Sequence, residues 1–117
     1  MDRPKKVLIC DDDLDFATTV AYILETEKCV PVVAESGEKA VEQVRRTEFD
    51  LVLMDIMMPG IGGVEAIRKI KRIDPKIRVI VMTGFSVTET INEALREGAV
   101  EVLYKPFDVD NFVKLVQ

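Results

Sequence analysis

The chain has 117 residues, 48% of them hydrophobic and 32% charged, a balance typical of one soluble globular domain built around one core. The formal net charge of −5 argues against nucleic-acid binding, because phosphate contacts need clustered lysine and arginine side chains. The chain contains no histidine, which excludes Ser-His and Cys-His catalysis, and no apolar run long enough to span a bilayer.

Short apolar runs alternate along the chain with segments whose apolar residues recur at helical spacing. The runs predict strands over residues 7–10, 30–33, 51–54, 79–82 and 102–104. The apolar faces of the predicted helices are formed, in chain order, by Phe16, Val20, Ile23 and Leu24, by Ala40, Val41 and Val44, by Val64, Ile67 and Ile70, by Val87, Ile91, Ala94 and Leu95, and by Val109, Phe112, Val113 and Val116.

Turn-forming residues separate these segments, as at Ser36-Gly37, Pro59-Gly60 and Asp74-Pro75. The central runs "LVLM" and "VIVM" do not alternate with polar residues, so we expect strands that are covered on both faces. This pattern predicts the α/β class, with a doubly wound five-stranded parallel sheet in one domain over residues 1–117. The last predicted helix is short, which leaves open whether the chain ends there naturally or belongs to a longer protein.

Chemically active residues follow four of the five predicted strands. The first strand leads to Asp11, Asp12 and Asp13, the third to Asp55, the fourth to Thr83 and the fifth to Lys105. Ligands of doubly wound sheets bind at the carboxyl ends of the strands, where we expect these side chains to meet. Clustered carboxylates predict a hard cation such as Mg²⁺, and the hydroxyl and ammonium groups suit phosphoryl oxygens.

The stretch "VLICDDD" carries a repulsion that a bound cation would relieve, because two like charges about 4 Å apart repel by about 4 kcal/mol at an effective dielectric near 20. Asp11 and Asp12 are the candidate metal pair. Asp55, alone on the central strand, is the candidate nucleophile for an aspartyl phosphate. Each aspartate also has an ordinary interpretation as a turn residue or helix cap, which we favour for Asp13 and Asp15.

Four segments, "VLICDDD", "LVLMDIMMPGIGGVEAI", "VIVMTGFS" and "GAVEVLYKPF", together resemble the response-regulator receiver domain of two-component signalling. The resemblance covers essentially the whole chain. It implies a flavodoxin-like sheet with strand order 2-1-3-4-5 and helices on both faces. It also implies a cytoplasmic phosphoacceptor switch rather than an enzyme, limited at most to Mg²⁺-dependent self-phosphorylation from small donors and self-dephosphorylation.

The resemblance assigns a role to each residue at the strand ends. It implies that Asp55 is the phosphoacceptor. It implies that Asp12, Asp55 and the backbone carbonyl of Met57 bind Mg²⁺ directly and that Asp11 acts largely through water. It also implies that Thr83 binds a phosphoryl oxygen and that Lys105 pairs with the phosphoryl group. The peptide before Pro106 is expected to be cis.

The implied partners follow from the same resemblance. A histidine kinase or histidine phosphotransfer domain would be the donor, and since this chain has no histidine, that donor lies on another protein or domain. A fused output or kinase domain is a further candidate, as is a homodimer through the fourth helix, fifth strand and fifth helix. We expect neither nucleic-acid nor membrane binding by this domain.

The chain departs from the family pattern at a few positions. Val102 occupies the place where the family often has an aromatic switch residue, and Gly62 a place where it often has Asp. Met57 and Phe85 put apolar side chains where they affect how water reaches the phosphoryl group. We therefore expect the switch in residues 84–97 rather than at Val102, and slow self-dephosphorylation.

Other functions fit the sequence less well. A phosphohydrolase of the haloacid-dehalogenase type would need Thr or Val at position 15, which is Asp15. A pseudo-receiver would lack an acidic, Thr or Lys position, and none is missing. An FMN-binding flavodoxin would need a Ser/Thr-rich loop after the first strand, where this chain has carboxylates. A P-loop nucleotide site is also not expected, because its sequence motif does not occur.

The two cysteines, Cys10 and Cys29, are too few for a disulfide framework and fit a reducing cytosol. Both lie in or beside apolar runs, so we expect buried thiols.

Overall fold

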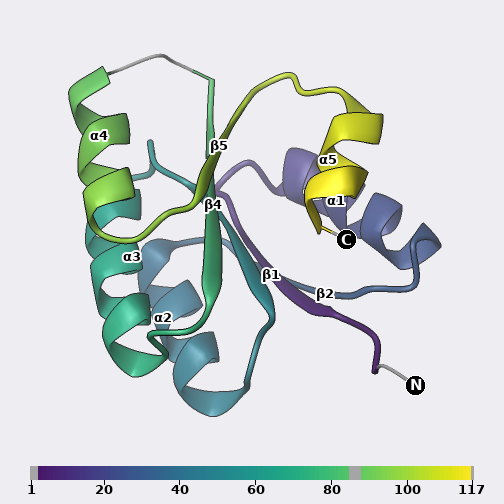
Figure 1. The fold of residues 1–117 in the computed structure, drawn as a ribbon, viewed down its shortest axis with the longest axis horizontal. Coiled ribbons are helices and arrows are strands. Elements are labelled where there is room, and N and C mark those ends of the chain that lie inside the picture. The colour runs from purple at the N-terminus through teal and green to yellow at the C-terminus, as the bar shows by residue number, and fades with distance from the viewer. Residues whose placement is uncertain (1–2, 85–87, 117) are drawn as a thin grey trace.

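The computed structural model describes residues 3–84 and 88–116. Strands and helices alternate along the chain, as the sequence predicts (Figure 1). Their bounds are β1 (Lys6–Cys10), α1 (Leu14–Thr26), β2 (Val30–Ala34), α2 (Gly37–Arg46), β3 (Leu51–Asp55), α3 (Gly62–Ile73), β4 (Arg78–Thr83), α4 (Thr88–Arg96), β5 (Glu101–Tyr104) and α5 (Val109–Val116).

The strands form one parallel sheet in the order β2-β1-β3-β4-β5, which confirms the flavodoxin-like arrangement. In the register of the sheet, Val7 lies opposite Leu51 and Asp55 lies opposite Met82. The chain leaves β1 toward β2 and then crosses back to β3. The carboxyl ends of β1 and β3 therefore form the point at which the winding direction reverses, where ligands bind in such sheets.

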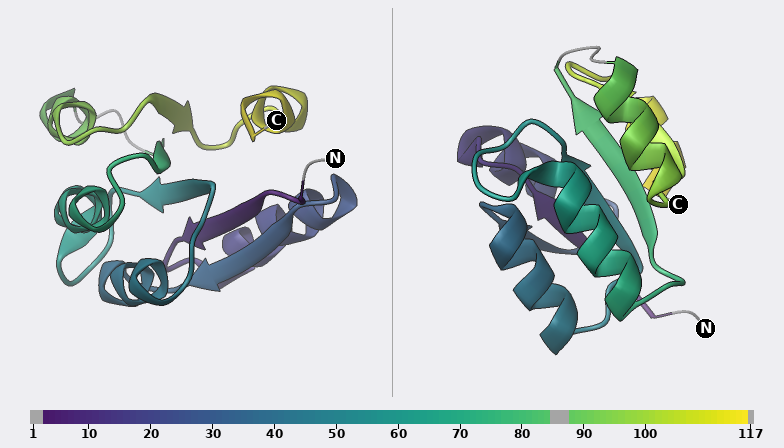
Figure 2. Two further views of the ribbon diagram at one scale, coloured as in Figure 1. Left: turned by 60° about the horizontal axis from the view of Figure 1, so that its bottom comes forward. Right: turned by 90° about the vertical axis from the view of Figure 1, so that its left-hand side faces the viewer.

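Helices cover both faces of the sheet (Figures 1 and 2). Helices α2, α3 and α4 pack on one face, where Ala40, Ile67 and Ile91 belong to one apolar core. Helices α1 and α5 pack on the other face, where Val20 and Phe112 belong to a second core. Two cores separated by one sheet are what a doubly wound domain requires.

The central strands are covered on both sides, as their continuous apolar runs predict. All five residues of β3 are buried, and so are the last five of the six in β4. By contrast β2 is an edge strand, and Val30 at its start keeps 45% of its surface exposed. Within the described residues, no helix is both long and apolar enough to cross a membrane.

Two predictions for the apolar faces of the helices are wrong. Leu95 and Val109 were expected on buried faces, but they are 41% and 49% exposed. Helix α4 buries Ile91 and Ala94, and α5 buries Phe112 and Val116, so each short helix presents a narrower apolar face than the stripe suggests. Val87, also assigned to the fourth stripe, lies outside the described residues.

Candidate functional site

The carboxyl edge of the sheet brings together the residues that the sequence singled out. Asp11 directly follows β1, Asp55 and Thr83 are the last residues of β3 and β4, and Lys105 directly follows β5. Since β3 lies between β1 and β4, the strand order alone makes these ends neighbours. The backbone amide of Lys105 also donates to the carbonyl of Thr83 at 2.8 Å, which ties the end of β5 to β4.

Three carboxylates converge at this edge. Asp11, Asp12 and Asp55 each offer an oxygen atom, and these oxygens lie within 4.8 Å of one another. Asp11 and Asp55 are buried, whereas Asp12 is exposed at the mouth of the cluster. An all-oxygen donor set of this kind, with one side open, fits a hard divalent cation such as Mg²⁺.

Asp13 differs from its neighbours, because it caps helix α1. Its Oδ1 accepts a hydrogen bond from the amide of Phe16 at 3.1 Å, and its own amide donates to Oδ1 of Asp11 at 3.0 Å. The capping interpretation is thus confirmed for Asp13. Asp15 lies in the first turn of α1, where a negative charge is favoured by the helix dipole.

Lys105 supplies the positive charge of the cluster. Its Nζ lies 2.6 Å from Oδ2 of Asp11 and 3.4 Å from Oδ2 of Asp55. The side chain is only 20% exposed, so it is not a solvated strand end. The Lys105–Pro106 peptide is cis, as expected.

The clustering shifts the pKa values of the charged groups. Burial raises the pKa of Asp55 to about 6, and the charge of Asp11 adds to this rise, while the Met57 amide and Lys105 oppose it. For Lys105, burial favours the neutral amine, but the hydrogen bond to Asp11 and the charges of both aspartates outweigh it and leave the pKa raised. At neutral pH the site therefore holds a basic carboxylate beside a charged ammonium.

The segment after β3 is fixed by two backbone features. The amide of Met57 donates to Oδ1 of Asp55 at 3.1 Å, while the Met57 side chain is 47% exposed. A Cβ at Gly63 would lie 2.5 Å from the Cα of Ile56 and 2.6 Å from the carbonyl oxygen of Asp55. Only glycine lets α3 begin this close to the end of β3. In the sequence, Gly63 stands beside Gly62 as an ordinary turn glycine would, and no pattern there indicates this close approach.

The residues near the expected switch differ in how deeply they are buried. Thr83 is buried at the end of β4, and Val102 is half-buried and packs against the core of α2, α3 and α4. Tyr104, two residues on, is 52% exposed. Phe85 and two other residues of the predicted switch segment 84–97 lie outside the described residues.

Phe16 is a neighbour of the site that no sequence signal indicated. The helical pattern placed it on the apolar face of α1, and it does pack against the core formed with α5. Its ring also lies under the Lys105 ammonium, with Nζ 4.4 Å from the ring centroid.

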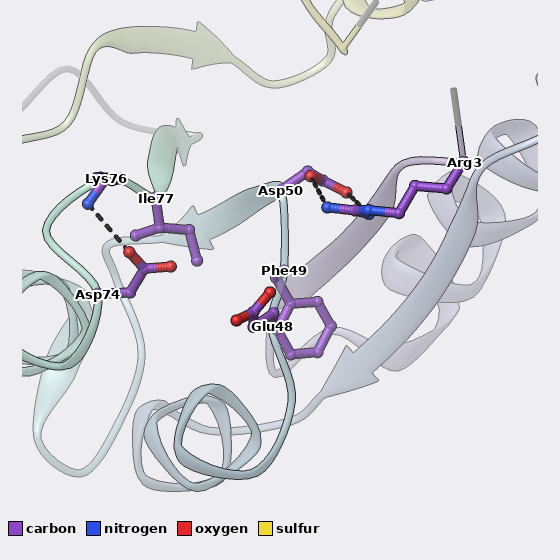
Figure 3. Close-up of a pocket in the computed structure, with 7 residues that line it drawn as sticks. All are labelled: Arg3, Glu48, Phe49, Asp50, Asp74, Lys76 and Ile77. Atoms are coloured by element: carbon purple, nitrogen blue, oxygen red, sulfur yellow. Dashed lines mark hydrogen bonds and ion pairs between the residues drawn. The ribbon is translucent and has the colours of Figure 1, made fainter. Parts of the chain in front are cut away.

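The opposite, amino edge of the sheet holds a separate pocket of about 340 Å³ (Figure 3). Asp50, just before β3, accepts hydrogen bonds of 2.8 Å from both terminal nitrogens of Arg3 and another of 2.8 Å from the Lys6 amide. Asp74 accepts one from the Lys76 amide at 3.1 Å. The carboxylates of Asp50 and Asp74 are both hydrogen-bonded, so this pocket resembles a structural anchor more than a reaction site.

The cysteines contribute no reactive thiol to the site. Cys10 is buried, its Sγ donates to the carbonyl of Ser36 at 3.2 Å, and burial raises its pKa to about 12. The buried-thiol prediction is confirmed for Cys10, whereas Cys29 is only half-buried.

Comparison with known proteins supports one family. The family model of the response regulator receiver domain matches residues 7–117. The transcriptional regulatory protein ZraR of Escherichia coli (strain K12) is 41% identical over 105 residues, which cover 90% of this chain and 24% of ZraR. Sporulation initiation phosphotransferase F of Bacillus subtilis (strain 168) is 35% identical over 106 residues, 91% of this chain and 86% of that protein. The chain spans about a quarter of the length of the ZraR proteins it matches.

Solved structures agree. A CheY-like receiver domain protein from Methanospirillum hungatei JF-1 superposes with a TM-score of 0.94 at 26% identity, covering 97% of this chain and 90% of that one. A response regulator from Burkholderia pseudomallei, with a phosphorylated aspartic acid, calcium ion and citrate, superposes with a TM-score of 0.89 at 26% identity, covering 97% and 66%. This chain therefore belongs to the response regulator receiver domains, the phosphoacceptor switches of two-component signal transduction.

Proposed function

We propose that Asp55 accepts a phosphoryl group from a phosphohistidine on a histidine kinase or a histidine phosphotransfer domain, with Mg²⁺ as cofactor. The observation that carries this proposal is the convergence of three aspartate oxygens within 4.8 Å, with the Lys105 ammonium between two of the carboxylates. Three carboxylates this close together repel one another when nothing is bound. A metal ion would bind the carboxylates, and a phosphoryl group on Asp55 would pair with Lys105.

The donor atoms divide between direct and indirect binding of the metal ion. Asp12 and Asp55, with the backbone carbonyl of Met57, would hold Mg²⁺ directly. The Lys105 ammonium lies 2.6 Å from Asp11 but 3.4 Å from Asp55, so Asp11 is more tightly engaged by the lysine, which favours contact with the metal ion through water. When bound, Mg²⁺ supplies positive charge that offsets the charge on the phosphoryl oxygens.

The reaction forms one bond and breaks one. A carboxylate oxygen of Asp55 attacks the phosphorus atom, and the P–N bond of the donor phosphohistidine breaks with its electron pair remaining on the imidazole nitrogen, which solvent protonates. With a pKa of about 6, the Asp55 carboxyl is mainly ionised at neutral pH and needs no base. The product is an acyl phosphate, with the Thr83 hydroxyl and the Lys105 ammonium as partners of its oxygens.

The output belongs to another surface. Apolar side chains are exposed along α4, β5 and the segment between them, with Leu95 at 41%, Val100 at 56% and Tyr104 at 52%. These exposures support a self-association or docking face formed by α4, β5 and α5. The same proposal includes a fused output or kinase domain and a cytoplasmic location. It also includes the expectation that this domain does not bind nucleic acid.

A labelling experiment tests the chemistry. The protein is incubated with Mg²⁺ and acetyl phosphate, and intact mass and peptide mapping locate any added phosphoryl group. We expect one hydroxylamine-sensitive group on Asp55, no labelling of Asp55→Asn, and normal labelling of Asp13→Asn, whose side chain can still cap α1. Equal labelling of Asp55→Asn at another residue would refute the assignment.

A further inference from the structure

Lys105 has an aromatic neighbour in addition to its two carboxylate partners. Its Nζ lies 4.4 Å from the centroid of the Phe16 ring, well within the range in which a cation is attracted by the negative face of a ring. The ammonium is therefore bounded on three sides, by Asp11 at 2.6 Å, by Asp55 at 3.4 Å and by the Phe16 ring.

The Phe16 ring is itself held in place. The Phe107 ring meets it nearly at right angles, at 82° with centroids 5.7 Å apart, and Phe107 lies 5.2 Å from the ring of Phe112. Phe112 is fully buried on α5. An edge-to-face contact of this kind fixes ring orientation beyond what burial alone would do.

The backbone fixes the position of the ring relative to the acidic cluster. Phe16 lies in the first turn of α1, and its amide donates to the side chain of Asp13. The amide of Asp13 in turn donates to Asp11. The ring and the nearest carboxylate partner of Lys105 are thus carried by one short hydrogen-bonded segment.

We propose that Phe16 is a positioning residue for Lys105. Its ring face holds the ammonium at the mouth of the carboxylate cluster, and Phe107 orients that ring. When a phosphoryl group arrives on Asp55, a role that rests on the proposed function, the ammonium is already aimed at it. Without the ring, the flexible lysine stem samples other directions, and fewer molecules are ready to pair with the phosphoryl oxygens.

Three substitutions at position 16 separate the ring face from mere bulk. Phe16→Leu and Phe16→Met keep an apolar side chain at this half-buried place but remove the π face. Phe16→Tyr keeps the face and serves as the conservative rescue. Two-dimensional spectra of the backbone amides establish that each variant is folded.

The first readout is the proton NMR shift of the Lys105 ε-methylene group. A methylene above a ring face is shifted upfield, and we expect this shift in the parent and in Phe16→Tyr but not in the Leu or Met variant. The second readout is the rate of labelling by acetyl phosphate with Mg²⁺. We expect a fall of about threefold to tenfold in the Leu and Met variants and near-parent rates in Phe16→Tyr.

The two readouts distinguish the possible failures. If the parent protein is not labelled on Asp55, the proposed function fails, while the methylene shift still tests the contact. If Asp55 is labelled and the Leu and Met variants keep the parent rate, Phe16 does not position Lys105. An unshifted methylene in the parent also overturns the proposal, and so does a labelling rate in Phe16→Tyr as low as that of Phe16→Leu.

Discussion

The two edges of the sheet both carry acidic side chains but provide opposite environments for them. At the amino edge, Asp50 accepts three hydrogen bonds of 2.8 Å, two from Arg3 and one from the Lys6 amide (Figure 3). At the carboxyl edge, Asp55 lies among two further aspartates and 3.4 Å from Lys105. The hydrogen bond from Arg3 lowers the pKa of Asp50, whereas burial raises the pKa of Asp55 to about 6.

The difference separates carboxylates that stabilise the fold from carboxylates that crowd one another, as the proposed metal and phosphoryl site would require. A paired aspartate favours the folded state in its ionised form, and a crowded one opposes it. Natural domains tolerate such local conflict mainly at functional sites, where a bound group relieves it. The same residue type therefore has opposite effects at the two ends of the same strands.

The largest expected effect is on labelling by acetyl phosphate. We expect Asp12→Asn to lower the Mg²⁺-dependent rate at least about 100-fold, or about 2.7 kcal/mol, because the exposed carboxylate of the cluster is lost. Asp74→Asn, at the amino edge, is the matched control and should label normally. Equal rates for both variants would mean that the two edges do not differ in function.

The second effect is on stability without Mg²⁺. We expect Asp55→Asn to raise the free energy of unfolding by about 1–2 kcal/mol, because it removes a buried charge from beside Asp11 and gives up only a long contact with Lys105. Urea titration at pH 7 measures the change. A lower midpoint than the parent would contradict the view that this cluster destabilises the fold.

The third effect is the pH dependence of that difference. The folded-state pKa of Asp55 is about 6 and its ordinary value is 3.8, so the folded state binds more protons between these values. The contribution of Asp55 to stability therefore falls as pH rises from about 4 to 6 and is constant above that range. We expect most of the advantage that Asp55→Asn has at pH 7 to be lost at pH 4. A gap that stays constant or widens toward acid would exclude the raised pKa.

The smallest effect is at the amino edge. Asp50→Asn should lower the free energy of unfolding by about 0.5–1 kcal/mol, mainly through the weakened hydrogen bond from the Lys6 amide, since the exposed Arg3 pair is screened by solvent. The sign is opposite to that expected for Asp55→Asn. Thermal or urea unfolding of both variants in one buffer tests this difference in sign. An Asp50→Asn variant that is more stable than the parent would contradict it.

The sequence predicts the elements and the carboxyl-edge residues well, for a physical reason. Apolar runs locate the buried strands to within a residue or two, and whatever follows a parallel strand must lie at one edge of the sheet. Strand order is a nonlocal property, so it came from the resemblance and not from the pattern. The widths of the apolar faces of α4 and α5 also depend on packing, which explains the errors at Leu95 and Val109.

Two features near the site could not be predicted from the sequence. Phe16 has the spacing of an ordinary core residue, and only the fold brings its ring to Lys105. Gly63 has the appearance of a second turn glycine, and only the folded structure shows α3 beginning against the end of β3. Both depend on contacts between segments that are distant in space until the sheet forms.

The adjacent glycines at the start of α3 set different rules for anyone who redesigns this chain. Gly62 has a φ of 76° but nothing within 4 Å of a built Cβ, so asparagine, which tolerates that backbone region, is a candidate replacement there. At Gly63 the added carbon would meet backbone atoms that cannot move aside without shifting Asp55. A protein engineer can therefore vary the first glycine, while the second fixes the spacing between β3 and α3.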